Sequence, residues 1–143
     1  MPRSRADVIV TAVQYVGEAD PDQCLEQVAG DLRRRGRRPY LIPVGGASSV
    51  GVLGYVLGAT ELVEQARATG LELDLVVVAS GSGGTQAGLA LGMHLVAPHI
   101  RVLGVSVGYP ADTLRQRVAD LAAGAARLPE VAASEPAAIE DYS

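Results

Sequence analysis

The sequence predicts an α/β fold with three layers, an open parallel sheet with helices on both faces. Short apolar runs alternate along the chain with amphipathic helical patterns, and this order calls for right-handed crossovers between parallel strands. Two of the apolar runs are almost continuous Val, Leu and Ile, which is typical of strands covered on both faces. The hydrophobic fraction is 48%, without Phe or Trp, so the core must consist of small and branched side chains.

Four strands and four helices are predicted. The predicted strands are residues 7–13, 39–44, 73–79 and 100–107. The predicted helices are residues 21–35, 54–69, 85–96 and 112–128, where apolar side chains recur at a helical spacing. Gly or Pro stands at or just beyond the end of each helix, as helix stop signals do. These residues are Gly36, Gly70, Pro98 and Pro129.

A single domain is predicted. Residues 1–128 are expected to form one α/β domain, since the 143 residues of the chain are enough for one core. Residues 129–143 are rich in Ala, Glu and Pro, and we expect them to form a loose C-terminal tail.

Composition argues against several classes of partner. The formal net charge is −4, whereas nucleic-acid binding needs a basic surface, so no nucleic-acid partner is expected. The arginine-rich residues 33–38 are expected to be a solvated helix end. No apolar run approaches the ~18 residues of a membrane span, so we expect no membrane partner and a cytoplasmic location. Cys24 is the single cysteine, which excludes an internal disulfide, and no metal site is predicted.

A glycine-rich turn joins the third predicted strand to the third helix. Its candidate binding residues are Gly81, Ser82, Gly83, Gly84 and Thr85. Such a turn points several backbone N–H groups at one place, at the positive end of a helix dipole, and so suits a phosphate. The alternative is an ordinary tight turn, in which glycine only supplies unusual dihedral angles.

Two common phosphate loops do not fit this turn. A P-loop needs a lysine after its last glycine, and the chain contains no lysine. A dinucleotide fingerprint counted from Gly81 would place Gln86 at its third glycine, and the next strand carries no acidic residue for the ribose. A compact loop for a single phosphate group remains.

Several motifs resemble one enzyme family. They are RPYLIPVGGAS at residues 38–48, GVLGY at 51–55, VVVASGSGGTQAGL at 76–89 and LGVSV at 103–107. Their order is similar to that of the D-cysteine desulfhydrase and 1-aminocyclopropane-1-carboxylate deaminase family, over about residues 6–127. Those are pyridoxal-phosphate enzymes of fold type II, the tryptophan-synthase-β-like fold.

The resemblance implies a cofactor, a reaction and a substrate class. It implies that Gly81–Thr85 hold the phosphate of pyridoxal 5′-phosphate. The parent enzyme would act on a small amino acid, by α,β-elimination or deamination, and release an α-keto acid and ammonia. We interpret residues 45–55 as a packing signature rather than a ligand site, with Tyr55 packing on a helix face.

The residues that would react are missing. The family binds its cofactor covalently through a lysine N-terminal to the matching region, and this chain has none. We therefore expect an internal fragment of a longer enzyme, with non-covalent phosphate anchoring at most and no catalytic residue of its own. His94, His99 and Cys24 are interpreted as packed or exposed residues, and Tyr109 is expected near the cofactor.

Two alternatives remain open from the sequence. The chain could be a non-catalytic module that binds a phosphorylated metabolite through the glycine turn, or a nonfunctional gene relic whose exposed sheet edge favours aggregation. A homo-oligomer or a complementing chain that supplies the missing segments would be the protein partner.

Overall fold

The structure is a computed structural model that describes residues 13–132. It divides into two compact units, one that ends at Leu41 and one that starts at Ile42. The sequence predicts one domain over residues 1–128 instead. Except for Val13, the predicted strand 7–13 lies outside the described residues.

The first unit contains helix α1, Pro21–Arg34. Asp20 begins the helix, because its carboxylate accepts two N–H groups of the first turn at 2.9 and 3.0 Å. Arg33 and Arg34 lie in the last turn, where cations favour the negative end of the helix dipole. Arg33 lies 3.7 Å from the carboxylate of Glu26, and both side chains are exposed. This arrangement agrees with the solvated helix end expected for this segment.

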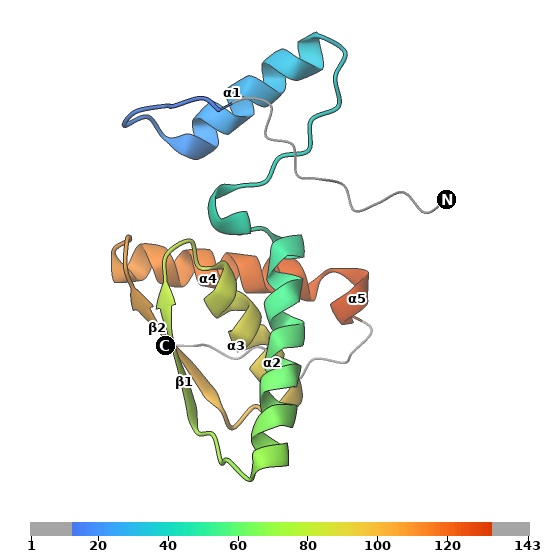
Figure 1. The fold of residues 1–143 in the computed structure, drawn as a ribbon, viewed down its shortest axis with the longest axis vertical. Coiled ribbons are helices and arrows are strands. Elements are labelled where there is room, and N and C mark those ends of the chain that lie inside the picture. The colour runs from blue at the N-terminus through green and yellow to red at the C-terminus, as the bar shows by residue number, and fades with distance from the viewer. Residues whose placement is uncertain (1–12, 133–143) are drawn as a thin grey trace. The chain divides into compact units, whose positions relative to one another are not determined.

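The second unit is an α/β arrangement around a two-stranded parallel sheet (Figure 1). Its elements are the short helix η1 (Val44–Gly46), α2 (Ser49–Thr69), β1 (Leu75–Ser80), α3 (Gly84–Val96), β2 (Arg101–Ser106), α4 (Ala111–Ala126) and α5 (Pro129–Ala132). Strands β1 and β2 pair in register from Leu75 with Arg101 to Ser80 with Ser106. The strands predicted over 73–79 and 100–107, and the crossover helix between them, are therefore confirmed.

Residues 39–44 do not form the predicted strand. They are irregular up to the start of η1, and the side chains of Tyr40 and Ile42 are 80% and 68% exposed. Pro39 and Pro43 account for this, since proline has no N–H to donate to a neighbouring strand. The next helix also starts earlier than predicted, because Ser48 caps it by accepting the Gly51 N–H at 3.1 Å.

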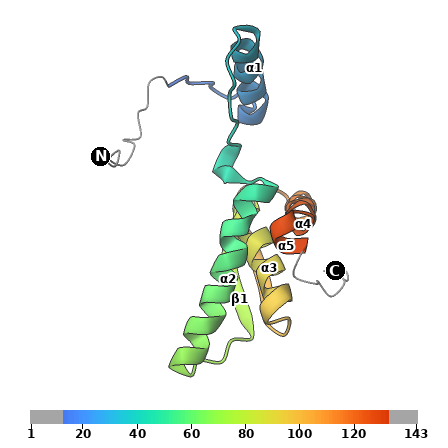
Figure 2. The ribbon, with the colours of Figure 1, turned by 90° about the vertical axis from the view of Figure 1, so that its right-hand side faces the viewer.

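Helices α2 and α3 lie over one face of strand β1 (Figure 2). Val76 and Val102 pack into the buried cluster formed with α2 and α3. On the opposite face Val77, Leu103 and Val105 are 58%, 52% and 52% exposed. The predicted second layer of helices is therefore absent from residues 13–132. A continuous apolar run is compatible with two covered faces but does not show what covers them.

Glycines on α3 bring α2 and α3 into close contact. A Cβ at Gly88 would overlap the Cβ of Tyr55 and lie 2.6 Å from the carbonyl oxygen of Val52. One turn later, a Cβ at Gly92 would lie 2.5 Å from the Cβ of Ala59. The backbone and Cβ of Tyr55 lie in this helix contact, but the residue is 46% exposed, so packing of its ring stays a prediction.

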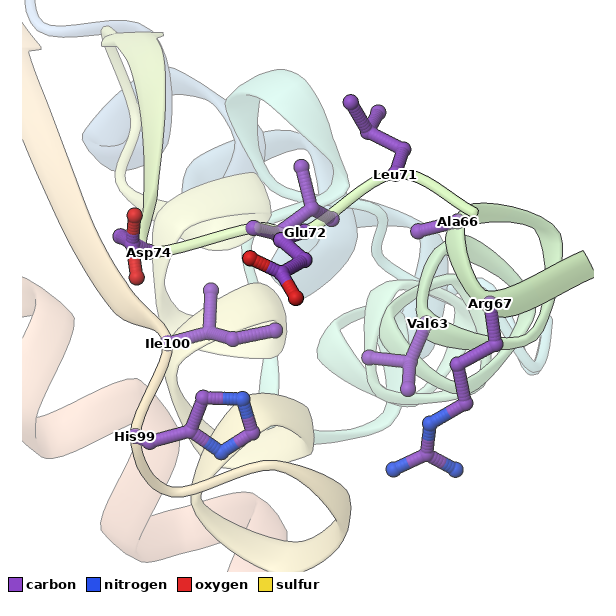
Figure 3. Close-up of a pocket in the computed structure, with 9 residues that line it drawn as sticks. Val63, Ala66, Arg67, Leu71, Glu72, Asp74, His99 and Ile100 are labelled. Atoms are coloured by element: carbon purple, nitrogen blue, oxygen red, sulfur yellow. The ribbon is translucent and has the colours of Figure 1, made fainter. Parts of the chain in front are cut away.

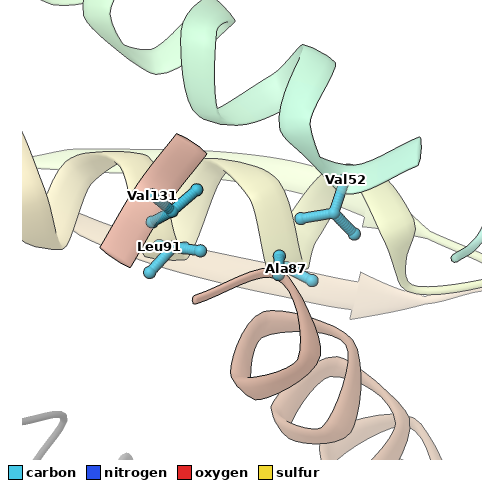
Figure 4. Close-up of a cluster of buried hydrophobic side chains, with 5 residues drawn as sticks. Val52, Ala87, Leu91 and Val131 are labelled. Atoms are coloured by element: carbon cyan, nitrogen blue, oxygen red, sulfur yellow. The ribbon is translucent and has the colours of Figure 1, made fainter. Parts of the chain in front are cut away.

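Helix α5 closes one of the two buried clusters. Val131 is 4% exposed and packs with Val52, Ala87 and Leu91, as Figure 4 shows. The segment expected to be a loose tail therefore begins with a docked helical turn at Pro129–Ala132. Residues 133–143 lie outside the described part of the chain.

Candidate phosphate-binding site

The glycine turn lies at the carboxyl end of β1 and leads directly into α3. Gly83 begins the helix with φ +89°, a left-handed conformation that glycine adopts without steric cost. No side chain of the described residues caps this end. The first hydrogen bond of the helix runs from the Ala87 N–H to the Gly83 carbonyl, at 2.9 Å. The N–H groups of Gly84, Thr85 and Gln86 therefore remain available at the positive end of the helix dipole.

Ser80 adds a buried hydroxyl at the base of the turn. The residue is 2% exposed, and its Oγ has no hydrogen-bond partner among the described residues. An unsatisfied buried polar group costs about 1–3 kcal/mol. Ser80 is the last residue of β1 and directly precedes the glycine turn that leads to the free N–H donors of α3, an order that suits a polar guest such as a phosphate group.

The five predicted residues differ in their surroundings. Gly83 and Gly84 are buried, whereas Gly81, Ser82 and Thr85 are partly exposed. A Cβ at Gly83 would lie 3.2 Å from Val118 Cγ2, so α4 supports the turn from below. A Cβ at Gly81 would meet nothing closer than a side-chain methyl at 3.7 Å. The turn is therefore packed against α4 at Gly83, while Ser82 and Thr85 stay partly exposed.

The turn that contains η1 lies against the glycine turn. Gly45 has φ +69°, and a Cβ there would lie 2.5 Å from Ser82 Oγ. A Cβ at Gly84 would lie 3.4 Å from the Cα of Ala47. Sequence reasoning treated residues 45–55 as packing only, because local spacing does not show which distant turn they contact.

Tyr109 follows β2 at the same edge of the sheet. Its backbone is held by the Ser106 hydroxyl, which donates to the Tyr109 carbonyl at 2.6 Å. The guanidinium carbon of Arg117 lies 5.0 Å from the centre of the Tyr109 ring, a cation–π distance. Arg117 Nε is buried without a partner among the described residues. Sequence reasoning missed Arg117, because nothing local distinguishes it from other arginines of α4.

The remaining candidates lie elsewhere. His94 is partly buried on α3, and His99 is exposed in the turn before β2. Cys24 is a free, partly buried thiol on α1. Residues 13–132 contain no group of three His, Cys, Asp or Glu side chains that could hold a metal ion. Within the same range no helix is long and apolar enough to cross a membrane.

The structure contains two further hollows. Figure 3 shows one of about 290 Å³ at the amino ends of the strands, lined by residues that include Arg67, Glu72 and His99. Parallel strands place this hollow at the opposite end of the sheet from the glycine turn. The other, of about 910 Å³, lies between α3, β2 and α4. Its wall includes Gln86, whose Oε1 is buried without a partner among the described residues.

Comparison with known proteins identifies the family. Residues 3–143 match the family of pyridoxal-phosphate dependent enzymes. The chain belongs to this family. Its cofactor is therefore pyridoxal phosphate at the level of the family, and the predicted fold type II is confirmed together with the α/β class.

Individual relatives confirm the predicted resemblance. The chain is 47% identical over 97 residues to the protein of Pyrococcus furiosus named "Putative 1-aminocyclopropane-1-carboxylate deaminase". The aligned region covers 68% of this chain and 30% of that protein. It is 43% identical over 102 residues to the D-cysteine desulfhydrase of Yersinia pestis (strain Pestoides F), covering 71% and 31% respectively.

A solved structure shows the same fold. The crystal structure of an ACC deaminase homologue aligns with a TM-score of 0.72 and 36% identity, over 87% of this chain and 37% of that one. In each of these three comparisons, the chain spans about a third of the length of the protein that it matches.

Proposed function

We propose that Gly81, Ser82, Gly83, Gly84 and Thr85 anchor the phosphate of pyridoxal 5′-phosphate in an enzyme of the D-cysteine desulfhydrase and 1-aminocyclopropane-1-carboxylate deaminase group. One observation carries this proposal: the first N–H groups of α3 have no side-chain cap, and the turn before them follows Ser80, whose buried hydroxyl has no partner among the described residues. The intact enzyme would convert a small amino acid to an α-keto acid and ammonia. A cytoplasmic location stays a prediction.

Each residue has a distinct role in the proposed anchor. The N–H groups of Gly84 and Thr85 donate to the phosphate oxygens, with the helix dipole adding a favourable field. The Ser82 and Thr85 hydroxyls, on partly exposed residues, add two further donors. Gly81 lets the backbone approach the ligand closely, and Gly83 supplies the left-handed conformation that begins the helix. The bound cofactor would supply an electron sink for the substrate carbanion.

The anchor is proposed to be non-covalent. The chain contains no lysine, so it offers no side-chain amine for the cofactor and no lysine to move a proton at the substrate. A homo-oligomer of these 143 residues adds no lysine either. We therefore propose that catalysis needs a segment outside this sequence, carried by a longer chain or by a complementing one.

A pair of variants at Gly81 tests the anchor. Gly81→Asp places a carboxylate beside the phosphate, and Gly81→Asn places a neutral side chain of the same shape there. The position has room for both, since its Cβ would meet only Val107 Cγ2 at 3.7 Å. Calorimetric titration with pyridoxine 5′-phosphate, which lacks the aldehyde and cannot react with amines, should show about tenfold weaker binding for Asp than for Asn.

The result also separates the proposal from its alternative. Equal binding by the Asp and Asn variants, or no binding by the unaltered chain, would contradict a phosphate anchor at this turn. The absent lysine favours a second candidate, a non-catalytic module for a phosphorylated metabolite. If inorganic phosphate binds as tightly as pyridoxine 5′-phosphate, the pyridine ring contributes nothing and this second candidate is preferred.

A further inference from the structure

We propose that Gly45 is a positioning residue for the phosphate anchor, because its missing side chain makes the space that Ser82 occupies. This inference rests on the function proposed above. A Cβ at Gly45 would lie 2.5 Å from Ser82 Oγ and 3.0 Å from Ser82 Cβ. The first of these separations is closer than any real Cβ contact, so any other residue at position 45 would push Ser82 away.

The backbone conformation of Gly45 brings the η1 turn close to Ser82. Gly45 and Gly46 have φ values of +69° and +64°, a conformation that L-residues rarely adopt. The turn is closed by its own hydrogen bonds: the Gly46 N–H donates to Pro43, and the Ser48 N–H donates to Gly46, both at 2.8 Å. These two N–H groups are already used within the turn, so neither is available to bind the phosphate.

The adjoining residues hold this turn in place. A Cβ at Gly51 would overlap the carbonyl oxygen of Gly46, so the first turn of α2 lies directly against it. On the other side, the Ala47 Cα would lie 3.4 Å from a Cβ at Gly84. The η1 turn is therefore held between α2 and the start of α3, and it offers Ser82 a fixed surface to pack on.

Gly46 provides a matched control for Gly45. Both residues have positive φ, so alanine at either position carries a similar backbone strain. The two differ in space, because a Cβ at Gly46 would meet nothing within 4 Å. Gly45→Ala should weaken the binding of pyridoxine 5′-phosphate about tenfold relative to Gly46→Ala, the loss of one hydrogen bond to a charged group.

A double-variant cycle tests whether Ser82 carries the effect. In the Ser82→Gly background there is no side chain to displace, so Gly45→Ala should leave phosphate binding unchanged. Equal binding by Gly45→Ala and Gly46→Ala, or the same loss with and without the Ser82 side chain, would overturn the proposal. Thermal melts of the unliganded variants check that each is folded.

Two further results keep the test decisive. If Gly45→Ala does not fold, Ser82→Gly is compared with the double variant, and weaker binding by the double variant would overturn the proposal. If the unaltered chain binds neither pyridoxine 5′-phosphate nor inorganic phosphate, the phosphate anchor itself is wrong. The failure of the anchor and the failure of the Gly45 role are thereby distinguished.

Discussion

Two serines at paired positions of the sheet have opposite environments. Ser80 and Ser106 are partners in the register of β1 and β2. The Ser80 hydroxyl is buried without a partner among the described residues, whereas the Ser106 hydroxyl donates to the Tyr109 carbonyl at 2.6 Å. The unsatisfied hydroxyl lies at the glycine turn. This polar group is costly in the free protein, and we propose that a phosphate bound at the turn satisfies it.

Replacing each serine with alanine should affect different properties, phosphate binding for Ser80 and the free energy of unfolding for Ser106. Ser80→Ala removes an unsatisfied buried group, so the free energy of unfolding should stay the same or rise by about 1 kcal/mol, while binding of pyridoxine 5′-phosphate weakens. Ser106→Ala removes a formed hydrogen bond, so stability should fall by about 1 kcal/mol with little change in binding. Urea unfolding and calorimetric titration measure the two quantities. Unchanged phosphate binding in Ser80→Ala would argue against a ligand at this hydroxyl.

Helices α2 and α3 approach each other closely because two glycines of α3 have no side chain at the contact. Gly88 and Gly92 lie one turn apart on α3 and face the backbone of α2. Their contacts link the η1 turn, which precedes α2, to the glycine turn, which precedes α3. The relative position of the two turns therefore depends on the packing of these two helices.

Alanine at two glycines should have opposite effects on stability. Gly88→Ala should lower the free energy of unfolding by about 1–3 kcal/mol, because the new methyl overlaps Tyr55. Gly54→Ala should raise it by about 0.5–1 kcal/mol, since Gly54 lies within α2 and a Cβ there meets nothing within 4 Å. Thermal and urea unfolding provide the measurement. A stabilising Gly88→Ala would show that the helices are not in close contact there.

At the scale of the whole molecule, the glycine turn and the absence of lysine have to be explained together. The described residues contain a turn that suits a phosphate, and the complete sequence lacks a lysine. The chain spans about a third of the relatives that it matches. The apolar side chains on the open face of the sheet are consistent with a surface that another segment covers.

The missing lysine gives a prediction for the whole chain. After incubation with pyridoxal 5′-phosphate and reduction with borohydride, peptide mass spectrometry should find no adduct on any side chain. The α-amino group of Met1 is the one primary amine in the sequence and is the expected site of any adduct. Pyridoxal without the phosphate is the control for non-specific reaction. A side-chain adduct would contradict non-covalent anchoring.

The sequence by itself determined the elements with strong local signals. The Val-rich runs of β1 and β2, and the Gly and Pro residues that end the helices, act over a few neighbouring positions and were predicted within a few residues. The glycine turn and its place before α3 were predicted for the same reason. Residues 39–44 were predicted wrongly, because apolar content outweighed two prolines, which lack the N–H that a central strand donates.

The tertiary structure alone decided which distant residues meet. Periodicity identifies an apolar side chain but not the surface that covers it, so the open face of the sheet could not be predicted. The contact of Gly45 with Ser82, the α4 support beneath Gly83 and the unpartnered hydroxyl of Ser80 all depend on segments far apart in the chain. Such contacts follow from how helices and strands pack together, and no local pattern encodes them.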